Sequence, residues 1–270
     1  YLNSKNGMII SDFIPQWVDN TDRKELSGDT LRNDALAFRL LKDVLGDIPM
    51  RKIDKEAIRK FKATSINRVK AVSVNTYLRH IKSGLNWAKQ EDIISDVPTI
   101  KMFKVGRSLP RYLGKEDVQK ILDYAKTAYP EMYRIIIFAL YTGSRRKEIT
   151  QAKYEHIQNG SIKLYGKGNK ERVVPLLPDA LEKKSGKGKL FAYNHVSTLT
   201  NYFKKIVVAC GIEAKFHDLR HTAGTQMLTK GIPLKVVKEI FGHSDIRTTE
   251  IYAQVLSEVV NQEMKKLDYD

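Results

Sequence analysis

Residues 161–176 read Ser-Ile-Lys-Leu-Tyr-Gly-Lys-Gly-Asn-Lys-Glu-Arg-Val-Val-Pro-Leu, and they form the one clear β pattern of the chain. Ile162 and Leu164 alternate with more polar neighbours, as they do in a strand with one buried face. The glycine-rich stretch 166–170 then turns the chain, and a second apolar run returns. The sequence therefore predicts a single β-hairpin with Lys167 at its tip.

The hairpin tip is not a nucleotide-binding P-loop. The Gly-x-x-x-x-Gly-Lys-Ser/Thr spacing is absent and no helix follows the glycines. A tip of this kind instead brings Lys167 within reach of a substrate, to which it can donate a proton. The alternative is a basic turn without a specific role.

The N-terminal part of the chain has helical periodicity. Within residues 1–100, Thr30, Asp54 and Ser73 are side chains that can cap helices. After Ser73 the apolar residues follow a 4-3-4-3 spacing, which is typical of a helix with one buried stripe. We therefore predict a helical domain over residues 1–100.

Helical patterns also surround the hairpin. Residues 116–125 are periodic, residues 132–141 are apolar enough to be buried, and the pattern after Pro178 is helical to the end of the chain. The expected fold class is mainly α with a small antiparallel β-hairpin. We expect residues 101–112 to form a basic interdomain linker and residues 113–270 to form a second, catalytic domain, with a last helix over 255–267.

Charge limits the classes of partner. The chain has 270 residues and a formal charge of +16, with a pI of about 9.7. Both halves are basic, which favours a polyanion, and DNA is the leading candidate; solubility or binding at a membrane surface are the alternatives. No apolar run is long enough to span a membrane, and the start does not look like a signal peptide. Because the sequence does not begin with Met, a preceding N-terminal segment remains open.

A single cysteine, Cys210, allows neither an internal disulfide nor a cysteine-rich metal site. It follows an apolar helical run, so we expect a small buried side chain. This composition fits a reducing cytoplasm, and with a DNA partner the expected location is the nucleoid.

Basic side chains recur at positions suited to contact DNA. In the helix after Ser73 they form a stripe beside the apolar one, and others lie in the linker, which has no steady period. A merely solvated face is the alternative. The candidate DNA-binding residues are Arg79, Lys82, Lys89, Lys101, Lys104, Arg107 and Arg111.

Residues 141–149 place a glycine before a short helix that opens with a basic cluster. A helix start of this kind is suited to bind an anion, and Arg145 would add a bidentate contact. Glu148 lies on the same turn and can orient an arginine through a salt bridge. A basic surface without this role is the alternative.

The run Phe216-His-Asp-Leu-Arg-His221 is the sharpest local motif. On a helix His217, Arg220 and His221 share one face. The spacing of the two histidines also resembles a zinc-protease helix, but Asp218 replaces the required Glu base and Arg220 would place a fixed positive charge beside the metal. We therefore do not expect zinc at this motif.

Further along, Gly242 is expected to end the helix that begins after Pro233, which leaves His243 on a turn ahead of Tyr252. A tyrosine there can attack phosphorus, although as a single residue it would more often be a core anchor. Taken with Arg145, Lys167, His217 and Arg220, these side chains indicate a site that breaks and rejoins DNA through a phosphotyrosine.

Together these segments resemble the tyrosine recombinase (phage integrase) family over roughly residues 108–260. Ser144 departs from the family, which usually has an apolar residue there, and we expect this to affect packing more than catalysis. The matching pieces are Thr142-Gly-Ser-Arg-Arg-Lys-Glu148, Gly166-Lys-Gly-Asn-Lys-Glu-Arg172, His217-Asp-Leu-Arg220, Gly242-His-Ser244 and Tyr252.

The resemblance implies a two-domain clamp around duplex DNA and a definite mechanism. Tyr252 would attack the scissile phosphate, His217 would assist its deprotonation, and Lys167 would protonate the leaving 5′-oxygen. Arg145, Arg220 and His243 would stabilise the transition state without metal or ATP.

The resemblance also implies partners. Four protomers would exchange two duplexes through a Holliday junction, each docking its last helix on a neighbour; docking on its own domain is the alternative. Accessory DNA-bending proteins are candidate further partners. The implied role is integration or excision of a mobile element. Resolution of replicon dimers, a type IB topoisomerase and a non-catalytic DNA-binding regulator are the alternatives.

Overall fold

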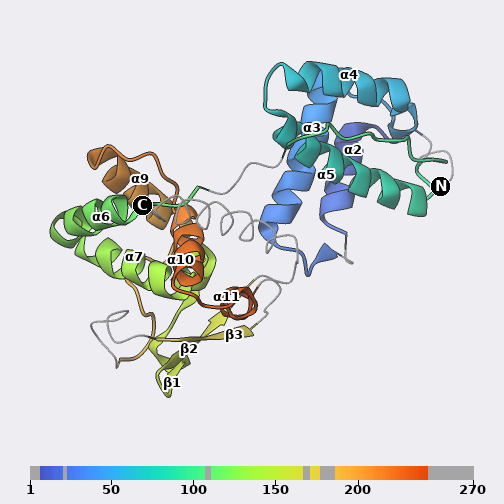
Figure 1. Cartoon of the computed structure of the whole chain (residues 1–270). Helices are drawn as coiled ribbons and strands as arrows, with labels where there is room; N and C mark the ends of the chain where they lie inside the picture. Colours follow the sequence, from blue (N-terminus) through green and yellow to red (C-terminus); the bar gives the residue numbers. More distant parts are fainter. Residues whose placement is uncertain (1–6, 21–22, 107–110, 167–170, 177–185, 243–270) are drawn as a thin grey trace. The chain divides into compact units, whose positions relative to one another are not determined.

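The computed structural model describes residues 7–20, 23–106, 111–166, 171–176 and 186–242 (Figure 1). The chain divides into two compact units, residues 1–107 and residues 108–270. Both are mostly helical, and the described strands form one three-stranded antiparallel sheet in the second unit. The predicted fold class, mainly α with a small antiparallel sheet, is confirmed.

The first unit is a helical domain around an aromatic core. Phe13, Trp17, Phe38 and Trp87 are in ring contact with one another inside it. The predicted apolar stripe of the fourth helix is completely buried, from Val74 to Ala88. The elements are α2 (Ile10–Val18), α3 (Gly28–Leu45), the 3₁₀ turn η2 (Met50–Lys52), α4 (Lys55–Ile66) and α5 (Ala71–Gln90).

Two of the three predicted helix caps were placed too late. Asp54 caps α4 as predicted, accepting the Ala57 N–H at 2.8 Å. In α3, however, the cap is Ser27, whose hydroxyl accepts the Thr30 N–H, so Thr30 lies in the first turn. In α5 the cap is Lys70, whose carbonyl accepts the Ser73 N–H. Since Ser and Thr are both good caps, spacing alone did not decide between neighbouring candidates.

Asp34 is a buried anion that joins three segments of the first unit. Its carboxylate accepts a hydrogen bond from Arg23 and, at 2.7 Å, pairs with the His80 ring of α5. The Arg23 guanidinium also stacks over Trp17, 3.3 Å from the ring centroid. A buried carboxylate with two such partners fixes the packing of α3 against α5.

Gly84 allows α3 and α5 to approach closely. A Cβ at this position would lie 2.4 Å from the Phe38 ring and 3.3 Å from the Trp17 Nε1. We expect Gly84→Ala to lower the free energy of unfolding of this unit by about 1–3 kcal/mol, because the buried ring has no space to move. Trp17 and Trp87 are the two tryptophans of the chain, so urea unfolding followed by tryptophan fluorescence reports this unit.

The matched control is Ser83→Ala, at the exposed neighbouring position of the same helix. It should leave the unfolding midpoint within experimental error or raise it slightly, since alanine favours helix. Equal midpoints for the two variants would contradict the close approach.

The segment predicted as linker is already packed at its start. Lys62 donates to the Lys101 carbonyl, and the Asn75 side chain exchanges two hydrogen bonds with the backbone of Phe103, at 2.8 and 3.0 Å. Met102 and Phe103 lie against the core of the first unit. The linker therefore does not begin at residue 101, because apolar residues between the lysines bind the preceding domain.

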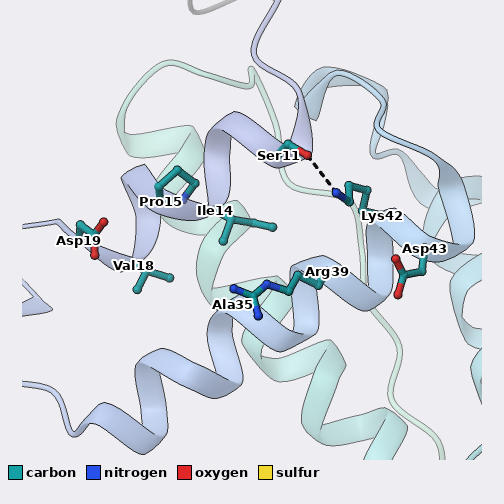
Figure 2. A pocket seen from close by; sticks show the side chains of 9 residues that line it. All are labelled: Ser11, Ile14, Pro15, Val18, Asp19, Ala35, Arg39, Lys42 and Asp43. Carbon is teal, nitrogen blue, oxygen red and sulfur yellow. Dashed lines mark hydrogen bonds between the residues drawn. The ribbon is translucent and has the colours of Figure 1, made fainter.

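A groove of about 600 Å³ lies between α2 and α3 of the first unit, and Figure 2 shows its lining. Ser11 and Lys42 face each other across it and are hydrogen-bonded at 3.1 Å. Two basic residues, Arg39 and Lys42, are balanced by Asp19 and Asp43. This balance of charge does not favour a phosphate, so the groove is not a candidate site for the DNA backbone.

The second unit places helices beside the sheet around a core of its own. The strands run in the order β1-β2-β3, and Ile162 pairs with Val174 in the predicted hairpin. The short β1 was missed, because two residues carry no period. The elements are α6 (Lys115–Ala128), α7 (Pro130–Thr142), α8 (Arg146–Gln151), η3 (Tyr154–His156), β1 (Ile157–Gln158), β2 (Ser161–Tyr165), β3 (Glu171–Pro175), α9 (Val196–Ala209), α10 (Asp218–Thr229) and α11 (Leu234–Phe241).

Packing in this unit brings the ends of several helices together. The core is formed by α7, α9, α10 and the inner face of the sheet, with residues such as Phe138, Phe203 and Leu219 buried. α10 packs on α7 and α11, and α11 lies against β3 (Figure 1). Cys210 is only partly buried at the end of α9, where burial raises the pKa of its thiol.

In the described part of the chain, no helix is both long enough and apolar enough to cross a membrane.

Candidate active site

The turn between α7 and α8 is fixed by Gly143. This residue ends α7 in the left-handed conformation, with φ of 58°, and its N–H donates to the Ala139 carbonyl. A Cβ here would lie 2.2 Å from the ring of Phe241 at the end of α11. Both the backbone angle and the space therefore require glycine. The turn that carries Arg145 is thus packed directly against the end of α11.

Arg145 is held by Glu148. Its backbone N–H donates to Glu148 Oε2 at 2.9 Å, and its guanidinium donates to Glu148 Oε1 at 2.7 Å. The predicted salt bridge is confirmed. The Glu148 side chain is 1% exposed, whereas that of Arg145 is 37% exposed. One edge of the guanidinium is therefore anchored while part of it stays accessible to an anion.

Arg172 is a buried arginine that the motifs did not single out. It lies on β3 and donates to Glu148 Oε2 at 2.7 Å, to the Thr142 carbonyl at 3.2 Å and to the Ile240 carbonyl. One signal was present in the sequence. Arg172 shares the inward face of the strand with Val174, so the alternation already placed a charge in the core.

The charges around Glu148 explain its titration. Burial opposes ionisation of this carboxyl, but the positive charge of Arg172 and hydrogen bonds from Arg172 and Arg145 outweigh burial, and the pKa of Glu148 is lowered. Glu148 is therefore a carboxylate at pH 7. Two arginines share this one anion, which leaves a net positive charge at the turn.

Arg220 connects the turn to α11. It is 2% exposed, and its guanidinium donates to the Gly143 carbonyl and, at 2.7 Å, to the Phe241 carbonyl. The guanidinium also lies over the Phe241 ring, 4.3 Å from the centroid. Arg220 and the Arg145 turn, 77 residues apart in the sequence, are thus in direct contact.

His217 caps the start of α10 and His221 lies in its first turn, and their ring centroids are 4.9 Å apart in a T-shaped contact. These two lie together, as the helical face predicted, whereas Arg220 is turned into the protein. Among the described residues, no group of three or more His, Cys, Asp or Glu side chains is placed to hold a metal ion.

The pKa of His217 is lowered to about 4. Desolvation by the surrounding protein is the largest cause, and the positive charges of His221, Arg220 and Arg145 add to it. The residue is nevertheless exposed by surface area, so water weakens this effect. The imidazole is neutral at pH 7 and can accept a proton.

This shift predicts a pH dependence. The folded pKa lies below the ordinary value of 6.5, so protonation favours the unfolded chain. The stability associated with His217 is complete above pH 6.5 and is lost as the pH falls toward 4. We expect the free energy of unfolding to fall more steeply over this window in the wild type than in His217→Gln.

Imidazole NMR titration checks the same shift directly. A bound phosphodiester would add negative charge near His217, so its pKa should rise toward 6.5 when DNA is present. The His217→Gln spectrum assigns the resonance. A His217 pKa near 6.5 in the free protein would contradict the prediction.

Three predicted catalytic residues, Lys167, His243 and Tyr252, lie outside the described residues, as does the predicted last helix 255–267. The structure does describe the segments that lead to the first two. β2 and β3 form the base of the hairpin, and α11 ends at Gly242 in the left-handed conformation, as predicted.

The candidate DNA-binding residues differ in their environment. Arg79, Lys82 and Lys89 are exposed along α5, and Lys89 forms an ion pair with Asp96 at 2.8 Å. Arg111 pairs with Glu213 at 2.9 Å, with both side chains largely in solvent, where such pairs are weak. Lys101 and Lys104 are exposed, and Arg107 lies outside the described residues.

Family comparisons agree with this geometry. The model of the phage integrase family matches residues 111–258, which hold the turn, the hairpin base and α10. The chain belongs to the phage integrase family. A model of the phage integrase SAM-like domain matches residues 10–104, in the first unit. As a tyrosine recombinase, the protein is an enzyme that cleaves and rejoins DNA. The family predicted from the motifs is confirmed.

Known recombinases are similar in sequence and in fold. Tyrosine recombinase XerD of Listeria innocua serovar 6a is 33% identical over 212 residues, covering 68% of this chain and 71% of XerD. Lambda integrase, as a dimer bound to a COC′ core site, superposes with a TM-score of 0.77 at 18% identity, covering 93% of this chain and 78% of the integrase. Its tetramer bound to a Holliday junction gives 0.75 at 17% identity, with 92% and 78% covered.

Proposed function

We propose that this tyrosine recombinase is site-specific and that Arg145, Lys167, His217, Arg220, His243 and Tyr252 form its active site. The observation that carries the proposal is the contact of Arg220 with the Gly143 turn. It brings the two arginines of the predicted set to one place, beside a histidine that is neutral at pH 7. Clustered guanidinium groups are suited to bind a phosphodiester whose negative charge increases in the transition state.

In the proposed reaction the Tyr252 hydroxyl oxygen forms a bond to the scissile phosphorus. His217 accepts the phenolic proton, and Lys167 donates a proton to the leaving 5′-oxygen as the P–O5′ bond breaks. Arg145, Arg220 and His243 stabilise the charge on the non-bridging oxygens. One phosphodiester replaces another of similar energy, so the balance needs no ATP.

The domain roles belong to the same proposal. Residues 1–100 would be the core-binding domain and residues 113–270 the catalytic domain, the two closing around duplex DNA. Arg79, Lys82, Lys89, Lys101, Lys104, Arg107 and Arg111 would contact the DNA backbone. Four protomers would assemble on two duplexes through the segment 255–267. A lambda integrase tetramer bound to a Holliday junction supports the number of protomers. The site of action would be the nucleoid of the cytoplasm.

The proposed role is integration or excision of a mobile element. Xer-like resolution of replicon dimers is the second candidate, and its basis is that relatives named XerD are similar in sequence. The two roles differ in their substrates, because dimer resolution exchanges identical sites whereas integration joins unlike ones. Footprinting on genomic fragments would identify the bound sites. Strand exchange between two identical or two unlike mapped sites would then decide between the roles.

A nicked suicide duplex tests the chemistry. When the strand is interrupted just to the 3′ side of the scissile phosphate, the short fragment that carries the freed 5′-hydroxyl diffuses away and the covalent intermediate accumulates. We expect an adduct that survives denaturation in SDS and contains the labelled segment on the 5′ side of the scissile phosphate, linked to the protein through its 3′ end. Absence of an adduct on the footprinted site would refute the proposed active site. Relaxation of supercoiled DNA without exchange would indicate a topoisomerase.

A further inference from the structure

Arg172 is buried, charged and absent from the proposed chemistry. Its side chain is 6% exposed, and its described hydrogen bonds all go to protein groups. A buried guanidinium is costly unless it is paired and hydrogen-bonded. It is paired with Glu148, and its other hydrogen bonds reach the Arg145 turn and the end of α11.

These contacts join segments that are far apart in the sequence. From β3, the guanidinium reaches the end of α7 at the Thr142 carbonyl, the turn at the Ser144 hydroxyl (3.3 Å) and α8 at Glu148. It also donates to the Ile240 carbonyl near the end of α11. Gly242 packs on the same side chain, since a Cβ there would lie 2.9 Å from the Arg172 Cδ.

Ser144 is part of this network. It was expected to alter packing, because the family usually has an apolar residue at this position. In the structure it is buried, its hydroxyl is hydrogen-bonded to Thr142 at 2.5 Å, and it accepts a hydrogen bond from Arg172. The departure from the family pattern thus adds a polar partner for the buried arginine.

We propose that Arg172 is a positioning residue, which neutralises Glu148 and ties the base of the β2–β3 hairpin to the Arg145 turn and the end of α11. This inference rests on the proposed function, which assigns the phosphate contact to Arg145. Glu148 Oε2 accepts hydrogen bonds from both the Arg172 guanidinium and the Arg145 backbone. With Arg172 present, the carboxylate is shared and Arg145 keeps its charge available to the phosphate.

Without Arg172, the buried carboxylate would have Arg145 as its one remaining cation among the contacts described. The pair would then be neutral, and the attraction of the turn for a phosphate would decrease. Arg172 would act through Glu148 and Arg145, so its loss should affect the chemical step more than DNA binding.

The test compares variants of the full chain on the nicked duplex that carries the footprinted site. We expect Arg172→Gln to lower the first-order rate of adduct formation by about 10–100-fold, as for loss of a supporting residue. Its affinity for the intact duplex should change less than about threefold. Arg172→Lys keeps the positive charge but loses the planar guanidinium and its several donors. Its rate should therefore lie between those of the wild type and Arg172→Gln.

A second substitution separates charge compensation from structural damage. Glu148→Gln removes the uncompensated anion, so adding it to Arg172→Gln should restore part of the lost rate. The matched control is Arg134→Gln, which breaks the Arg134–Glu131 pair of α7 (2.8 Å), away from the turn. The control should have lower thermal stability than the wild type. Its rate of adduct formation, measured on folded protein, should stay within about twofold of the wild-type rate.

Carboxyl NMR titration gives a readout that does not depend on catalysis. The pKa of Glu148 should be below its ordinary value in the wild type and above it in Arg172→Gln or, if that variant is too unstable, should rise in Arg172→Lys. A wild-type rate in Arg172→Gln, no rescue by Glu148→Gln, or an unchanged Glu148 pKa would each overturn the proposal. If the wild type forms no adduct, the proposed active site fails, and the titration still decides whether Arg172 controls Glu148.

Discussion

Replacing Tyr252 with phenylalanine is expected to abolish the covalent protein–DNA adduct. Phenylalanine keeps the ring and removes the oxygen that would bond to phosphorus, so no phosphotyrosyl link can form. DNA binding does not depend on that oxygen, and the dissociation constant should stay within about twofold of wild type. The measurement is denaturing electrophoresis of a labelled suicide duplex, together with equilibrium binding to the intact duplex at fixed salt.

The matched control for this variant is Tyr193→Phe. Tyr193 also belongs to the second unit, where its ring stacks on Tyr202 with centroids 4.9 Å apart. This variant should form the adduct at the wild-type rate. An adduct that persists in Tyr252→Phe, or that maps by mass spectrometry to another tyrosine, would contradict the assignment. If the wild type binds the duplex but forms no adduct, the result would instead indicate a DNA-binding regulator.

Replacing Arg145 with alanine is expected to lower the rate of adduct formation by about 10²–10³-fold, the effect of removing one donor that stabilises an oxyanion. The guanidinium is oriented by Glu148 at 2.7 Å and remains 37% exposed. It is therefore preorganised for a phosphate. Single-turnover cleavage at saturating protein measures the chemical step, and Arg145→Lys should be intermediate because it keeps the charge and loses the bidentate contact.

Arg146→Ala is the control, since it removes a neighbouring guanidinium whose described partner is the Thr200 hydroxyl. Its rate should fall less than tenfold. Arg145→Ala should remain folded, because Glu148 keeps its ion pair with Arg172. Equal rates for Arg145→Ala and Arg146→Ala would remove Arg145 from the proposed active site.

The family and the fold class could be predicted from the sequence because they depend on local patterns. The hairpin has period-two alternation, α5 has a helical apolar stripe, and both are borne out in the structure. The Glu148–Arg145 ion pair could also be predicted, since the two residues lie on one helical turn. Local errors arose where neighbouring residues were equally good, as with Ser27 and Thr30.

The sequence by itself determined which side chains are available for phosphate chemistry, their order, and the helix start, hairpin or turn on which each of them lies. Only the tertiary structure decided which of the basic residues are exposed and which are buried. Arg145 and Arg172 look equally basic in the sequence, but one is partly open to solvent and the other is enclosed by four segments of the chain. The physical reason is that desolvation and pairing depend on long-range contacts, such as those of Arg172 with Thr142 and Ile240, and no local period encodes them.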